Sequence, residues 1–81
     1  MVEPAELVVT AIKRAEDRDT LIVRFFNITD EPVPGAQVAM PGATRARLVN
    51  LNEEPQEEWR DGSTLMLEVG PKKIVTVEFE L

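Results

Sequence analysis

The chain has 81 residues, a net charge of −6 and neither cysteine nor histidine. This length predicts one domain over residues 1–81, and the missing residue types exclude thiolate ligands, the commonest zinc ligand and the usual neutral-pH proton shuttle. The acidic excess argues against a nucleic acid partner, and no apolar run approaches the ~20 residues of a membrane helix.

Strand-forming residues recur at period two or in short apolar runs along the chain, which predicts β-strands. We expect six of them, at 6–14, 20–28, 36–40, 44–51, 63–69 and 72–81. In the last one Val75, Val77, Phe79 and Leu81 face inward, while Thr76, Glu78 and Glu80 face outward. Turn sequences separate the strands: EPVPG at 31–35, PG at 41–42, DG at 61–62 and GP at 70–71. This pattern predicts an all-β fold, a small antiparallel β-sandwich (immunoglobulin-like) of about six to seven strands.

The loop at 15–19 carries the charged segment Glu16-Asp17-Arg18-Asp19 between two predicted strands. Its length suits the tip of a β-hairpin, where aspartates bond nearby backbone. A calcium site is the alternative, but an arginine separates Asp17 from Asp19 and the other oxygens of a calcium loop are missing. We therefore expect a solvated hairpin tip.

A second acidic segment contains Glu53, Glu54, Glu57, Glu58 and Asp61. A catalytic acid needs a raised pKa, which comes from burial or a close like charge, and this segment has few apolar neighbours. We expect a polar, solvated loop. The chain also has no base to activate a serine and no glycine-rich phosphate loop, so no catalytic residue is predicted.

Two residues have a weaker functional alternative beside a structural one. Trp59 is the only tryptophan; we expect it to cover the edge of the core, and a sugar-stacking platform is the alternative. Asn27-Ile28-Thr29 matches the N-glycosylation pattern, but an asparagine at a strand end is expected to turn its amide toward its own backbone.

Three ordered stretches resemble the C-terminal β-sandwich segment of glycoside hydrolase family 38, the α-mannosidases. The stretch 8–27 is similar to an Ala-x-Lys strand, a Glu-Asp turn and an Ile-x-x-Arg-aromatic-x-Asn strand of that family. The stretch 48–55 is similar to its Asn-Leu-x-Glu segment, and 69–81 to its closing strand, although Lys73 stands where many members carry an acid. The matching residues of the first stretch are Ala11, Lys13, Glu16, Asp17, Ile22, Arg24 and Asn27.

The resemblance implies an accessory, non-catalytic C-terminal module of a zinc-dependent retaining α-mannosidase. The zinc and the aspartate nucleophile of such an enzyme belong to an upstream catalytic domain, so this chain is expected to hold no cofactor. A carbohydrate-binding or protein-interaction β-sandwich module is the alternative. Arginine outnumbers lysine and cysteine is absent, which weakly favours a bacterial cytoplasmic source.

The predicted strand at 20–28 is apolar on both faces, whereas a two-layer sandwich covers only one face of each sheet. Leu21, Val23 and Phe25 alternate with Ile22, Arg24, Phe26 and Ile28. We therefore expect the second face to dock on the remainder of the parent glycosidase, or on another copy when the chain is isolated, with Arg24, Phe26 and Ile28 as the interface candidates. An arginine lying over the sheet with its head in water is the alternative for Arg24.

Overall fold

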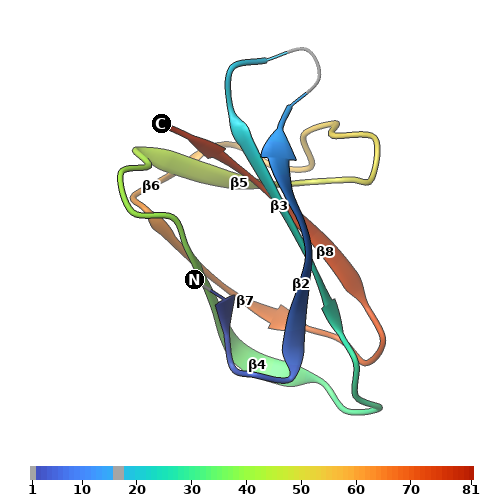
Figure 1. The fold of residues 1–81 in the computed structure, drawn as a ribbon. Helices are drawn as coiled ribbons and strands as arrows, with labels where there is room; N and C mark the ends of the chain where they lie inside the picture. Colours follow the sequence, from blue (N-terminus) through green and yellow to red (C-terminus); the bar gives the residue numbers. More distant parts are fainter. Residues whose placement is uncertain (1, 16–17) are drawn as a thin grey trace.

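The chain folds as two antiparallel β-sheets, in a computed structural model that describes residues 2–15 and 18–81. One sheet has the strand order β1-β4-β7, and the larger one has the order β2-β3-β8-β5-β6 (Figure 1). Within the described residues there is no helix, and thus none that could cross a membrane. The strands are β1 (Val2–Glu3), β2 (Leu7–Arg14), β3 (Leu21–Asn27), β4 (Val33–Ala39), β5 (Arg45–Val49), β6 (Arg60–Asp61), β7 (Thr64–Val69) and β8 (Ile74–Glu80).

The all-β sandwich predicted from the sequence is confirmed, while the immunoglobulin-like assignment stays a prediction. All six predicted strands occur, and two short ones, β1 and β6, add to them in the described part of the chain. Of the charged loop, Glu16 and Asp17 lie outside the described residues, so the calcium alternative stays untested.

The turn predicted at 31–35 was wrong for its last three residues. Strand β4 already begins at Val33 and continues through Pro34 and Gly35, with a register shift between Val33 and Ala36 against β7. Gly35 has a φ of 67°, a left-handed conformation that glycine adopts without steric cost. This bulge-like irregularity lets Val33 and Ala36 both be buried although a proline and a glycine separate them.

The main core lies between the two sheets and is built from alternating side chains. In β3 and β8, Val23, Phe25, Val77 and Phe79 point inward and have no exposed surface. Val38 of β4 and Leu65 and Val69 of β7 meet them from the smaller sheet. The period-two pattern thus gives one buried face for each central strand, as expected for packed sheets.

The opposite face of the large sheet, which we call the outer face, is also partly covered. Ile22, Thr76 and Glu78 point away from the main core and are nevertheless buried. Ala15 and Val49 form a second apolar cluster with Ile22. The loop that follows β5 lies over this end of the sheet, and Figure 1 shows it in yellow beside the β2–β3 hairpin. Part of the outer face of the large sheet is therefore buried by the chain itself.

Gly62, in the turn between β6 and β7, has a φ of 108°, a conformation that residues with a Cβ rarely adopt. Gly62→Ala is expected to lower the free energy of unfolding by about 1–2 kcal/mol because of backbone strain, although no atom would clash with the added methyl group. Urea unfolding measures this change. Gly70→Ala is the control, because Gly70 has no positive φ and its Cβ would meet only the flexible Lys73 side chain; equal losses in both variants would contradict the strain argument.

Candidate functional site: the outer face of the large sheet

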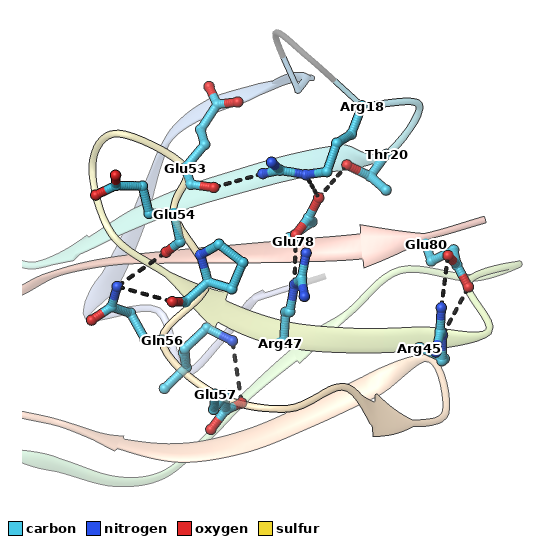
Figure 2. Close-up of polar contacts among 12 residues, drawn as sticks. Arg18, Thr20, Arg45, Arg47, Glu53, Glu54, Gln56, Glu57, Glu78 and Glu80 are labelled. Carbon is cyan, nitrogen blue, oxygen red and sulfur yellow. Dashed lines mark hydrogen bonds and ion pairs between the residues drawn. The ribbon is translucent and has the colours of Figure 1, made fainter.

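A fully buried carboxylate, Glu78, organises the covered end of the outer face. Both of its oxygens accept hydrogen bonds (Figure 2): Oε2 from Arg18 Nε at 2.7 Å and from the Thr20 hydroxyl at 2.5 Å, and Oε1 from Arg47 Nε at 2.8 Å. These partners come from the β2–β3 loop region and from β5, on either side of β8. We call Glu78, Arg18, Thr20 and Arg47 the Glu78 cluster.

Glu53 joins the loop after β5 to this cluster. Its backbone carbonyl accepts a hydrogen bond from Arg18 Nη2 at 2.6 Å, and its carboxylate pairs with Lys13 Nζ of β2 at 2.9 Å. Glu53 is buried and has a φ of 65°, a left-handed conformation that costs about 1–2 kcal/mol for a residue with a Cβ. The ion pair and the hydrogen bond offset this strain and hold the loop over the sheet.

The expectation that the acidic segment is wholly solvated was therefore wrong for Glu53, which is buried against Lys13. Glu57 is half-buried; it accepts hydrogen bonds from the Leu48 amide and from Arg60. Glu54, Glu58 and Asp61 are exposed as expected. The sequence pattern missed this difference because the contacts form only in the fold. Glu53 meets Lys13 of β2, which is distant in sequence, and Glu57 meets the Leu48 amide of β5.

Burial by itself would raise the pKa of Glu78, but the hydrogen bonds from Thr20, Arg18 and Arg47 outweigh it, so the pKa lies below its ordinary value. A carboxylate that is ionised and whose two oxygens are both occupied cannot donate a proton at neutral pH. The Glu78 cluster is therefore a structural clamp rather than a general acid.

The lowered pKa of Glu78 predicts that the free energy of unfolding depends on pH in the acidic range. A group whose pKa is lower in the folded state gives its full stabilisation above its unfolded pKa of about 4.3, and this stabilisation is lost as the pH falls through the folded value. We expect the free energy of unfolding to fall below about pH 4. Urea unfolding at pH 7, 5, 4 and 3 measures it. A Glu78→Gln variant should lose less stability over that range than the wild type, and an identical acid profile would contradict the assignment to Glu78.

Trp59 lies against the guanidinium groups of the outer face. Arg47 lies 4.0 Å and Arg45 4.7 Å from the centre of its ring. Arg45 in turn forms a two-point ion pair with Glu80, with distances of 2.8 and 2.9 Å. Because Arg45 and Arg47 point to the same side of β5, the ring face that meets them is occupied by the protein itself.

Asn27, the candidate glycosylation residue, is fully buried. Its Nδ2 donates hydrogen bonds to the carbonyl oxygens of Glu31, Val69 and Gly70, at 2.8, 3.3 and 3.0 Å. Its Oδ1 accepts from the Thr29 amide and hydroxyl. As expected, the amide turns toward the backbone, and here it also joins the end of β3 to the β7–β8 turn.

The other end of the outer face carries apolar side chains that the described residues leave open to solvent. Val8, Phe26 and Ile74 stand in one cross-strand row over β2, β3 and β8. Val8 is 42% and Ile74 53% exposed, Phe26 is half-buried, and Ile28 just beyond β3 is 48% exposed. We call Val8, Phe26, Ile28 and Ile74 the outer patch.

Arg24 lies between the outer patch and the Glu78 cluster. Its Nε donates to the Thr76 hydroxyl at 3.2 Å and its Nη2 to the Leu51 carbonyl at 3.4 Å. Among the described residues these bonds leave Nη1 available to a further acceptor. The structure thus brings two of the predicted interface residues, Phe26 and Ile28, into one patch and places Arg24 at its border.

The described residues, 2–15 and 18–81, contain neither a metal-ligand cluster nor a cavity that would suit a small ligand. Residues 6–77 match the family model of the glycosyl hydrolases family 38 C-terminal beta sandwich domain. The chain belongs to this family. No curated protein and no solved structure matches it. The family 38 sandwich domain is non-catalytic by itself.

The sequence did not reveal the Glu78 cluster of this family 38 domain. Glu78 follows the ordinary in-out alternation of β8, and nothing in that pattern separates it from the half-exposed Glu80. Two arginines spaced two apart, Arg45 and Arg47, were the available signal, because they place two cations on one face of β5. Their pairing with β8 became evident only from the fold.

Proposed function

We propose that this family 38 sandwich domain is an accessory module that packs on the catalytic part of a larger α-mannosidase-like hydrolase and supports it. The outer patch carries the proposal. Val8, Ile28 and Ile74 keep about half of their surface in water, and covering the rest of each side chain is worth about 1 kcal/mol. Such a gain favours docking on another apolar surface over leaving the patch free.

Arg24 is expected to fix the orientation of the docked surface. It stands at the border of the outer patch, and Nη1 is available to a carboxylate or carbonyl of the docked surface. Hydrogen bonds from arginine to a charged acceptor are stronger than neutral ones and are geometrically specific. The docked surface is therefore expected to be apolar with an acidic or carbonyl group at its edge.

The parent hydrolase is proposed to be a zinc-dependent retaining α-mannosidase, by its family. The described residues of this chain do not fit a zinc site, since they offer no group of three or more potential ligands. The zinc of such an enzyme would be held by other parts of the protein. The contribution of the sandwich domain is stability and placement of the catalytic part.

The test is a comparison of the isolated domain with the hydrolase that carries it. Phe26→Ser is expected to lower the unfolding temperature of the whole enzyme by several degrees more than that of the isolated 81-residue domain, because docking energy is lost in addition to local packing. Met66→Ser is the control, since Met66 is 58% exposed on β7 of the other sheet. An identical shift in both proteins would contradict docking through the outer patch.

Sugar binding by Trp59 is separated from docking by a direct titration. Trp59 is the only tryptophan, so its fluorescence reports on its own surroundings. We expect no change on adding mannose or short mannosides, because Arg47 already covers the ring face. A saturable change would instead favour a carbohydrate-binding module.

A further inference from the structure

Strand β2 is a free edge of the large sheet. It pairs only with β3 among the described strands, and its other side has no strand beside it. Val9 and Ile12 of this edge point toward the inner side of the sheet, as do their partners Phe25 and Val23, yet they are 39% and 49% exposed. An exposed edge with apolar side chains is a template for pairing with another strand.

The backbone groups that point outward from β2 follow from the alternation of an antiparallel ladder. The Asn27 amide donates to Lys73 on the β8 side, whereas the Ile28 amide donates to Glu6 on the β2 side. Phe25 and Val23 therefore direct their N–H and C=O groups toward β8. Their partners on β2, Val9 and Ile12, direct theirs to the free edge.

These two residues have an unusual spacing. In a regular strand, outward-directed residues recur every second position, but the bulge between Val9 and Ala11 places Val9 and Ile12 three positions apart. A regular partner strand, with its hydrogen-bonding residues two positions apart, cannot pair with the backbone groups of both Val9 and Ile12. A second copy of β2 running antiparallel has the same spacing at the same place, so that Val9 meets Ile12 of the second copy and Ile12 meets its Val9.

We propose that the domain forms a two-fold symmetric dimer through antiparallel pairing of β2 with β2 of a second copy, about an axis between Thr10 and Ala11. Each Val9–Ile12 pair then exchanges both backbone hydrogen bonds, and the four apolar side chains cover one another on the inner side. The large sheets of the two copies join into one continuous sheet. The contact is isologous, as in most homodimers.

The charges of β2 agree with this register. Val8 comes opposite Lys13 and Leu7 opposite Arg14, so no two like charges face each other directly. Each of these pairs also keeps to one face of the sheet. The interface includes Val8 at the border of the outer patch but leaves Phe26, Ile28 and Ile74 free, since they lie on or beside β3 and β8. The proposed docking on a parent enzyme can therefore be tested at Phe26 and Ile28 separately from the dimer.

Sedimentation over a concentration series tests the dimer. Ile12→Lys is expected to weaken association more than tenfold, because a lysine on a free edge opposes pairing. The matched control is Ile28→Lys, which alters an equally exposed isoleucine of the outer patch and should leave the dimer constant within about twofold. Circular dichroism confirms the fold of each variant. A wild type that stays monomeric up to about 1 mM overturns the proposal, as does association that only Ile28→Lys removes.

A cross-linking experiment locates the contact without relying on affinity. The chain has no cysteine, so a Thr10→Cys variant carries a single thiol beside the proposed axis. A short bismaleimide is expected to convert it into a covalent dimer at micromolar concentration. A Met66→Cys variant places the thiol on the other sheet and should stay monomeric under the same conditions. Equal cross-linking of both variants would overturn the β2 register.

Discussion

Glu78→Gln is expected to lower the free energy of unfolding by about 3–5 kcal/mol, the range seen when one partner of a buried ion pair is removed. The substitution keeps the shape of the side chain but removes its charge. Arg47, whose side chain is 14% exposed, loses its ion-pair partner, and the half-buried Arg18 loses its ion pair with Glu78. The new glutamine amide N–H₂ would also face the donors of Arg18, Thr20 or Arg47, with which it cannot form a hydrogen bond as an acceptor. Urea unfolding followed by circular dichroism measures the loss, and a domain of this size has only about 5–10 kcal/mol to lose.

The control for this prediction is Glu80→Gln, at the next outward position of β8. Glu80 also pairs with an arginine, Arg45, but both side chains are more than a third exposed. Water screens such pairs, so this variant is expected to remain close to wild-type stability. Equal losses at both positions would mean that Glu78 acts as an ordinary surface pair and that the cluster does not clamp the fold.

Asn27→Ala is expected to lower the free energy of unfolding by about 2–4 kcal/mol, because the buried carbonyl of Val69 and the partly buried carbonyls of Glu31 and Gly70 lose a common donor. A cavity adds to the loss. The Thr29 amide and hydroxyl also lose their acceptor. Equilibrium unfolding in urea measures the change, and hydrogen exchange is expected to increase first in the β7–β8 turn.

Two companion variants test the reason for the Asn27 effect. Asn27→Asp keeps the acceptor for Thr29 but removes the donor, so it should retain only part of the wild-type stability. Asn52→Ala changes an exposed asparagine in the loop after β5 and should be nearly neutral. If Asn27→Asp were as stable as the wild type, the three carbonyl contacts would contribute nothing and the account of this joint would be wrong.

The sequence predicted most of the fold because the strands are built from local patterns. Alternation in β8 and the turn dipeptides at 41–42, 61–62 and 70–71 placed strand ends within a few residues. The resemblance in 8–27 led to the family that the comparison found. The exception was 31–35, where Pro and Gly suggest a turn but the chain instead extends through a register shift in β4.

The covering of the outer face could not be predicted in the same way. The sequence indicated correctly that β3 is apolar on both faces, but it assigned the whole second face to a partner. In the fold, Ile22 is covered by the chain itself, through Ala15, Val49 and the loop that Glu53 holds down. This burial of the outer face depends on contacts of Arg18 and Lys13 with Glu53 in the polar loop after β5. These residues are far apart in the sequence, so a local sequence pattern does not predict the contacts.

The central claim is that the outer patch is the surface by which this family 38 domain joins a larger hydrolase. Hydroxyl-radical labelling tests it most directly, by comparing the oxidation rates of Phe26 and Met66 in the isolated domain and in the complete enzyme. The account predicts that Phe26 becomes protected several-fold in the complete enzyme while Met66 is labelled equally in both. Equal labelling of Phe26 in the two proteins would contradict it.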